Sequence, residues 1–265
     1  MCSTSCSKSA MSDDYSQGVA RFVDFVDEDL ESAARTAQAI ARGVPPGGRI
    51  LDIGAGTGAL AVPLARAGYR VTALEPDDGM RSLMMARAQR DPEVDALAAR
   101  LTMLPLTVDE LEAGAHFDRA FSHAVAHLLS PSAFERLLAG AARQLAPGAA
   151  LLVDIAVDCA GRQPLPMERV AERSFGEARF EHWRELAERA PGQWSTRWVF
   201  RVMHGGRLAE EVERRFDWRT DDPERVAHRA GALGLRLRGL WAEFDGTPFV
   251  RGDSRSAVLE LVRAG

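Results

Sequence analysis

The sequence predicts a doubly wound α/β fold, in which helices cover both faces of a mostly parallel sheet. Apolar strand-like runs alternate with helix-like segments from about residue 50 to residue 154, as in strands joined by right-handed crossovers. The first run, Ile50–Ile53, breaks abruptly into glycines that open a helix at Ala59–Ala67. The second run, Arg70–Leu74, ends in Glu75. Because ligands of such sheets lie at the carboxyl ends of the strands, these two strand ends are expected to hold one nucleoside.

The residues before the first strand divide into two parts. Residues 1–14 are rich in serine and cysteine and show no helical or strand periodicity, so we expect a flexible leader. In residues 15–48, apolar side chains recur at helical spacing over Arg21–Val26 and Leu30–Ile40, and the glycines and prolines at 43–48 would end the second helix. The sequence therefore predicts helical structure ahead of the sheet.

The turn after the first strand reads Gly-Ala-Gly-Thr-Gly at residues 54–58. Glycine tolerates a positive φ and has no Cβ, so backbone amides and a helix N-terminus can approach a ligand closely there. Gly54, Gly56 and Ala59 also satisfy the looser dinucleotide pattern, which leaves a nicotinamide oxidoreductase as a minor alternative. Asp52 argues against that alternative, because a dinucleotide-binding strand is usually apolar two residues before its first glycine.

These residues resemble the first motif of the class I S-adenosylmethionine-dependent methyltransferases, which reads much like Leu-Asp-Ile-Gly-Ala-Gly-Thr-Gly at residues 51–58. The likeness continues in the expected order through Phe117–Ser122, which is similar to the family's fourth strand, and residues 145–154, which are similar to its fifth. The resemblance implies S-adenosylmethionine as cofactor and a seven-stranded, Rossmann-like methyltransferase sheet. It also implies that the helices of residues 15–48 form a lid over the cofactor.

The resemblance assigns the cofactor to specific residues. Gly54 and Gly56 would admit its methionine end, and Asp52 would orient the ammonium group directly or through water. Glu75 would bind both ribose hydroxyls, and Met80 would flank the adenine. The plainer alternatives are that Asp52 belongs to a buried polar network and that Met80 fills the core. The predicted cofactor-binding residues are Asp52, Gly54, Ala55, Gly56, Gly58, Glu75, Pro76, Met80, Thr107, Val108 and Ser122.

One segment departs from the family pattern. Many members carry an acid near the adenine amino group after the third strand, whereas this chain has Leu-Pro-Leu-Thr-Val at residues 104–108. Thr107 or Asp109 would then take the place of that acid, and the adenine contact is the part of the cofactor site that the resemblance defines least.

Residues 156–220 are predicted to be an insertion after the fifth strand that covers the substrate. Met167–Ala190 is charged and is interpreted as helical, whereas Trp194–Val202 alternates between apolar and polar side chains like a strand. Gly205-Gly206 would form a tight turn, after which Leu208–Trp218 returns as the antiparallel partner. The insertion is therefore expected to be a helix followed by an antiparallel hairpin.

Residues 221–265 are expected to return to the core that residues 49–155 begin. Asp221–Pro223 is typical of a helix start, because it offers an acidic cap and a proline in the first turn. Leu235–Phe244 and Ala257–Val262 would be the last two strands, in the antiparallel arrangement that the family requires.

Two histidines are the predicted catalytic residues. An ammonium acceptor must lose a proton before it can attack a methyl group, so an amine substrate favours a nearby base. His123 and His127 follow the fourth strand, and their spacing of four places them on one face if the segment is helical. The alternatives are that His123 only packs or contacts the cofactor through its backbone, and that His127 caps a helix.

The predicted substrate contacts come from the lid and the insertion. Tyr15 would approach from the lid, and Trp194 and Trp198 would form an aromatic wall for an apolar or cationic substrate. Alternatively, the two tryptophans would form a core between two layers or a contact in a dimer, and these roles explain them equally well. Arg197, on the opposite face of the strand, would bind a substrate carboxylate or lie in solvent.

Three cysteines suggest a second kind of acceptor. Cys2 and Cys6 lie in the leader and Cys159 follows the fifth strand, so three thiolates could converge on a thiophilic atom. This would resemble the arsenic(III) methyltransferases, although the chain lacks their usual cysteine placement within the core. The spacing does not fit a tetrahedral zinc site, and no metal is expected.

Composition limits the remaining classes. With 46% hydrophobic and 27% charged residues, a net charge of −5 and a pI near 5.8, the chain has no basic footprint for nucleic acid. No stretch approaches the roughly 18–20 apolar residues that span a bilayer. We therefore expect a cytoplasmic enzyme, as a monomer or homodimer, that methylates nitrogen or oxygen of a small molecule. The alternatives are an arsenical methyltransferase and a cofactor-binding regulatory or partner protein without turnover.

Overall fold

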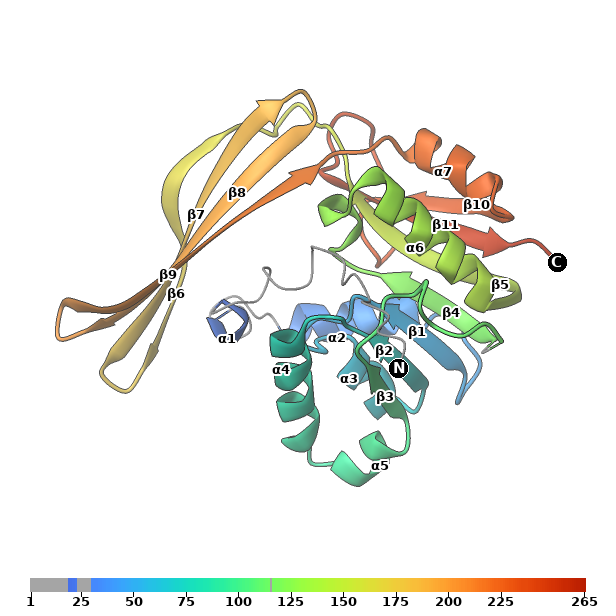
Figure 1. Cartoon of the computed structure of the whole chain (residues 1–265), viewed down its shortest axis with the longest axis horizontal. Coiled ribbons are helices and arrows are strands. Elements are labelled where there is room, and N and C mark those ends of the chain that lie inside the picture. Colours follow the sequence, from blue (N-terminus) through green and yellow to red (C-terminus); the bar gives the residue numbers. More distant parts are fainter. Residues whose placement is uncertain (1–18, 23–29, 115) are drawn as a thin grey trace, which may run out of the picture.

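A seven-stranded sheet forms the body of the protein in a computed structural model that describes residues 19–22, 30–114 and 116–265 (Figure 1). The strand order is β10-β11-β5-β4-β1-β2-β3, and β11 runs antiparallel to both of its neighbours while the other pairs are parallel. The strands are β1 (Arg49–Ile53), β2 (Arg70–Leu74), β3 (Leu101–Leu104), β4 (Phe117–Ser122), β5 (Leu145–Ala156), β10 (Leu235–Trp241) and β11 (Ser256–Arg263). The predicted doubly wound fold class is confirmed.

Helices pack on both faces of this sheet. On one face α6 and α7 pack over Leu51 and Leu151, and on the other α2, α3, α4 and α5 pack over Ile50 and Phe121. Neighbouring residues of a strand therefore enter opposite cores, which explains why the strands are almost continuously apolar. The helices are α1 (Ala20–Phe22), α2 (Leu30–Ile40), α3 (Ala61–Arg66), α4 (Asp78–Gln89), α5 (Val94–Ala98), the 3₁₀ helix η2 (Ala126–Leu128), α6 (Pro131–Gln144) and α7 (Pro223–Gly231). None of the described helices is long and apolar enough to cross a membrane.

A second sheet, which we call the cover sheet, follows β5 and extends away from the core (Figure 1). Its four antiparallel strands are β6 (Leu165–Phe175), β7 (Ala178–Ala190), β8 (Gln193–His204) and β9 (Arg207–Arg219). The predicted hairpin is present as β8 and β9. Its turn contains Gly205 and Gly206, whose φ values of 56° and 76° require glycine.

The helix predicted over Met167–Ala190 is wrong, because this segment forms β6 and β7. Its glutamates, arginines and alanines favour a helix locally. Gly176 interrupts the segment with a φ of 58°, and β7 then pairs with β8 along its whole length. The tertiary pairing overrides the local preference, so residues 156–220 contain a four-stranded sheet and no helix.

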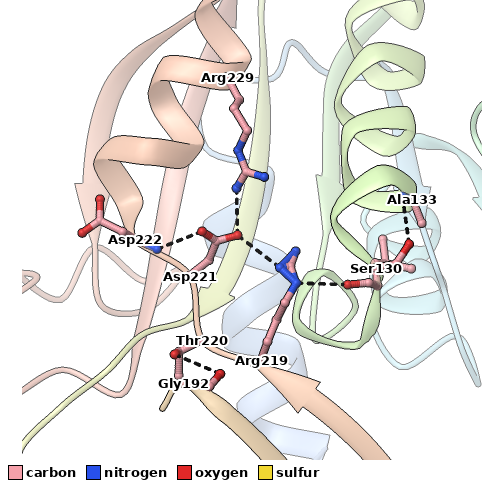
Figure 2. A network of polar contacts seen from close by, with 9 residues as sticks. Ser130, Ala133, Gly192, Arg219, Thr220, Asp221, Asp222 and Arg229 are labelled. Atoms are coloured by element: carbon pink, nitrogen blue, oxygen red, sulfur yellow. Dashed lines mark hydrogen bonds and ion pairs between the residues drawn. The ribbon is translucent and has the colours of Figure 1, made fainter. Parts of the chain in front are cut away.

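One carboxylate ties the cover sheet to the core where β9 leads into α7 (Figure 2). Arg219, the last residue of β9, donates from Nε to the carbonyl oxygen of Leu129 at 3.2 Å and forms an ion pair with Asp221 at 3.3 Å. Arg229 on α7 binds the same carboxylate oxygen at 2.8 Å. The side chain of Asp221 is only 12% exposed, so its charge offsets two partly buried cations.

Asp221→Asn is expected to lower the free energy of unfolding by about 1.5–3 kcal/mol, because it removes the charge from hydrogen bonds to two arginines. Urea denaturation measures this change. Asp253→Asn is the matched control, since Asp253 is exposed and its carboxylate forms no hydrogen bond or ion pair with a described residue. Equal stability of the two variants would contradict the structural role of Asp221.

Candidate active site

The glycine turn between β1 and α3 is fastened to the end of β2. The backbone N–H groups of Gly54 and Ala55 both donate to the carbonyl oxygen of Leu74, each at 2.9 Å. The N–H of Gly56 donates to the carboxylate of Glu75 at 2.8 Å. The two strand ends that the sequence predicted to cooperate are therefore joined directly.

The three glycines of the turn all have a positive φ, but their surroundings differ. A Cβ on Gly54 would lie 2.5 Å from the Val125 side chain, and a Cβ on Gly58 would lie 2.6 Å from Met84. A Cβ on Gly56 would meet no atom within 4 Å. Packing and backbone conformation thus require glycine at 54 and 58, whereas Gly56 combines a positive φ with open space beside the backbone.

Asp52 and Glu75 are buried carboxylates, with 2% and 8% of the residue exposed. Burial raises the pKa of Asp52 well above its usual value, and the charge of Glu75 raises it further. Burial also raises the pKa of Glu75, although hydrogen bonds from the N–H groups of Asp77 and Gly56 oppose this shift. Two acids that repel each other in a buried position favour a cationic ligand.

The predicted cofactor, S-adenosylmethionine, fits the site that the glycine turn, Asp52 and Glu75 form. Among the described residues, Asp52 Oδ2 and Ser122 Oγ are buried without a hydrogen-bond partner. A buried carboxylate oxygen without a donor is costly, and the ammonium group of S-adenosylmethionine would supply one. The open side of Gly56 would admit the methionine end, and Glu75 would take the ribose, as predicted from the sequence.

The remaining predicted cofactor residues have varied surroundings. Met80 is buried in the first turn of α4, where its N–H donates to the capping carboxylate of Asp77 at 2.9 Å. Pro76 is exposed, and its carbonyl oxygen accepts a hydrogen bond from the Arg81 guanidinium at 2.7 Å.

After β3, Thr107 uses both its N–H and its hydroxyl to bind the carboxylate of Glu110, each at 2.8 Å. Val108 is 2% exposed and packs against α6 at Gly140. The polar groups of Thr107 are therefore already engaged within its own loop. The adenine contact stays a prediction.

The structure brings His123 and His127 together at the carboxyl edge of β4. His123 is exposed and its ring lies 5.3 Å from that of Phe244. His127 lies in η2 and meets the Trp218 ring edge-on at 5.9 Å. Burial lowers the pKa of His127 to about 4, and the charges of His123, Arg162 and Arg219 add to this effect. His127 is therefore neutral at pH 7.

Asp154 is a residue that the sequence placed only in the fifth strand. Both of its carboxylate oxygens accept the N–H of Ala124, at 2.9 and 3.0 Å. Burial raises its pKa, and the charge of His123 opposes that shift. A signal was present: an acid near the end of β5 lies beside the end of β4 in a parallel sheet.

The tryptophans predicted to contact substrate lie on the inner face of the cover sheet. Trp194 is buried and stacks on Trp218 with ring centres 5.8 Å apart. The Arg162 guanidinium lies over both rings, at 5.9 and 5.0 Å. Trp198 is half-buried and meets Phe216 edge-on at 4.8 Å. Trp194 therefore anchors the cover sheet on the core, and Trp198 continues the aromatic face away from that anchor.

The other predicted substrate residues are placed differently. Arg197 forms ion pairs with Glu213 at 2.6 Å and Glu185 at 3.6 Å, on the face opposite the tryptophans. Cys159 is half-buried beside Arg162 in the loop after β5. Tyr15, Cys2 and Cys6 lie outside the described residues, so the lid contact and the convergence of three thiols stay predictions. Within the described part of the chain, no group of three or more His, Cys, Asp or Glu side chains could hold a metal.

Comparison with known proteins shows which family the core resembles. Residues 50–148 match the family whose description is "Methyltransferase domain". This part of the chain is therefore similar to a methyltransferase domain. A demethylmenaquinone methyltransferase from Renibacterium salmoninarum is 38% identical over 71 residues, which are 27% of this chain and 29% of the relative. The match thus spans less than a third of that relative's length.

Solved structures share the whole architecture. The CcbJ methyltransferase from Streptomyces caelestis has a TM-score of 0.75 at 19% identity, over 93% of this chain and 96% of that one. The sugar N-methyltransferase KedS8 from Streptoalloteichus has a TM-score of 0.73 at 13% identity, over 100% and 99%. The amino pentose methyltransferase CalS10 from Micromonospora echinaspora, solved with bound S-adenosylmethionine, has a TM-score of 0.68 at 16% identity, over 93% and 97%. The predicted methyltransferase fold is confirmed, and the family match over residues 50–148 supports the predicted enzyme class.

Asp52→Asn is expected to raise the melting temperature of the protein without cofactor at pH 7. Because the folded pKa of Asp52 lies above its unfolded value of about 3.9, this aspartate destabilises the folded state increasingly as the pH rises above that unfolded value, and pH 7 lies above it. The same substitution should weaken S-adenosylmethionine binding about 10- to 100-fold, through loss of a charged hydrogen bond. Calorimetry measures the affinity, with Asp95→Asn on the surface of α5 as control. An unchanged affinity would exclude Asp52 as the ammonium ligand.

Gly56→Ala and Gly58→Ala form a matched pair, since both introduce a side chain at a positive φ, which costs about 1–2 kcal/mol. Gly58→Ala should lose more stability, because its Cβ also meets Met84. Gly56→Ala should keep more stability yet lose cofactor affinity at least about tenfold, since its Cβ enters the space beside the ligand. Urea denaturation and calorimetry on both variants test this, and tight cofactor binding by Gly56→Ala would refute it.

Proposed function

We propose that this methyltransferase transfers a methyl group from S-adenosylmethionine to an amine nitrogen of a small molecule. The cofactor supplies a methyl group on a sulfonium, which is already a good leaving group. The protein therefore gains most by holding acceptor and methyl group in line at reacting distance. Asp52, Gly56 and Glu75 hold the cofactor in this proposal, and the ends of β4 and β5 present the acceptor.

Two acidic side chains at the acceptor side, neither with an ion-pair partner among the described residues, are the observation that carries the proposal of an amine. Asp154 and Glu243 both lie close enough to interact, and Glu243 immediately precedes Phe244, whose ring contacts His123. In the described part of the chain, neither carboxylate forms an ion pair with an arginine or histidine. Carboxylates without a cationic partner favour a protonated amine over a neutral hydroxyl group.

An aromatic inner face of the cover sheet supports an acceptor with a sizeable apolar or ring-shaped body. Trp198 meets the rings of His182, Phe200 and Phe216 nearly at right angles, so part of its own surface faces away from each of them. Such surfaces bind sugars and other rings by contact area and also attract cations. The relatives described as a sugar N-methyltransferase and an amino pentose methyltransferase agree with an amino sugar as acceptor.

The two histidines have different roles in this proposal. His123 is exposed, so it can take the proton of an ammonium acceptor and pass it to water. A pKa of about 4 makes His127 a weak base at pH 7, so it stays neutral and packs against Trp218. A cytoplasmic location and a homodimer stay predictions, as does the arsenical alternative.

Paired acceptors test the nitrogen assignment. Amino sugars and the same sugars with hydroxyl in place of the amine are incubated with the enzyme and radiolabelled S-adenosylmethionine, and label should enter the amines alone. His123→Gln should lower turnover about 100-fold or more, because it removes the base. His127→Gln is the matched control and should lower turnover much less. Labelling of the hydroxyl sugars, or of neither set, would overturn the proposal.

A further inference from the structure

Arg162 lies in the loop after β5, at the carboxyl edge of the sheet where ligands of such folds bind. Its guanidinium lies over the rings of Trp194 and Trp218, at 5.9 and 5.0 Å from their centres. Nη2 of this side chain donates to the backbone carbonyl oxygens of Val157 at 3.2 Å and Arg255 at 2.7 Å. Two aromatic rings and two backbone groups therefore hold the cation in one position.

The charge of Arg162 lacks a carboxylate partner. In the part of the chain that the structure describes, Arg162 forms no ion pair, and its Nε–H is buried without an acceptor. The acid of the same loop, Asp158, instead accepts a hydrogen bond from the hydroxyl of Thr220 at 2.8 Å. Burial lowers the pKa of Arg162, and the Cys159 and Asp158 side chains oppose that shift only in part. A partly buried cation of this kind is stabilised by an anionic ligand.

Trp194 has a second donor that lacks an acceptor. Only 3% of this residue is exposed, and its indole N–H has no hydrogen-bond partner among the described residues. The indole N–H of Trp218, by contrast, donates to the hydroxyl of Thr196 at 2.8 Å. Buried donors are rarely left unpaired, so the surroundings of Arg162 have more donors than acceptors. The oxygens of an anion would supply the missing acceptors.

This cation lies at the acceptor side of the site. One of the two rings under Arg162 also meets the ring of His127 edge-on at 5.9 Å. The acids assigned to the amine are associated with the other histidine, since Glu243 directly precedes Phe244, whose ring lies 5.3 Å from that of His123. Charges of both signs therefore line the acceptor side, and they would complement an acceptor that itself carries both signs.

We propose that Arg162 binds an anionic group of the acceptor, a carboxylate or a phosphate, and so selects amines that carry such a group. This inference rests on the proposed function for the amine. The planar guanidinium has five N–H donors, and those that the backbone carbonyls do not use can pair with two oxygens of one anion. A neutral substituent in the same place would leave the cation without a partner, so the anionic acceptor binds more tightly.

Three amino sugars test this inference: glucosamine, its 6-carboxylate analogue and glucosamine 6-phosphate. Each is titrated into the protein loaded with S-adenosylhomocysteine, which has no methyl group to transfer. Calorimetry should show that at least one of the anionic sugars binds about tenfold or more tightly than glucosamine. The tighter of the two identifies the anion as carboxylate or phosphate. Equal affinity for all three sugars, or no detectable binding of either anionic sugar, would overturn the proposal.

Arg162→Gln should abolish the preference for the anionic sugar, because the amide carries no charge. Arg162→Lys should retain part of it, since the charge stays while the planar pair of donors is lost. Arg189→Gln is the matched control and should keep the full preference, because Arg189 is exposed in β7 and donates to the hydroxyl of Ser195 at 3.3 Å. A merely structural Arg162 would lower the melting temperature without changing the ratio of the affinities. An unchanged ratio in Arg162→Gln would overturn the proposal.

The inference and the proposed function fail separately, because the calorimetric comparison needs no methyl transfer. A protein that prefers anionic sugars through Arg162 yet methylates no amine refutes the proposed function and retains the anion site. A protein that methylates amines without any preference for anionic ones refutes the inference and retains the function.

Discussion

The hydrogen bonds between the glycine turn and the end of β2 are the constraint on which the site depends. Two N–H groups of the turn donate to Leu74, and a third donates to Glu75. These bonds satisfy backbone groups that would otherwise be orphaned at the end of a buried strand, and they hold the turn in which Gly56 has open space beside its backbone. The parallel register of β4 and β5 then places Ser122 and Asp154 at the same edge.

This arrangement concentrates buried acids whose charge the protein itself does not neutralise. Burial raises the pKa values of Asp52, Glu75 and Asp154, and in Asp52 one carboxylate oxygen has no partner among the described residues. Such groups reduce the stability of the folded chain, and a cationic ligand would offset this cost. In the proposed function two cations meet this requirement: the cofactor's ammonium at Asp52 and a protonated amine acceptor near Asp154.

The sequence predicts the core more closely than the cover sheet, for a physical reason. β2 and β4 have the bounds expected from their apolar runs, and the glycine turn occurs as predicted, because local chemistry determines both. The prediction of a helix at Met167–Ala190 is wrong because the strand structure of this segment depends on its pairing with β8, which the local sequence does not specify. The contact of Asp154 with the Ala124 N–H could not be predicted either, since it joins distant segments.

The cover sheet and the core would contribute differently to the proposed reaction. The cover sheet is attached to the core at the Arg219–Asp221 ion pair and at the stacked tryptophans beside Arg162, and at its other end Phe22 of α1 stacks on Phe200 with ring centres 5.3 Å apart. Its aromatic inner face lies between these attachments, where shape and apolar area would select the acceptor. The core carries the groups that bind the cofactor and move the proton. Selectivity for the acceptor can therefore change through substitutions in the cover sheet while the glycine turn and the carboxylates of the core stay the same. For this reason the cofactor can be identified from the sequence, whereas the acceptor depends on the assembled insertion.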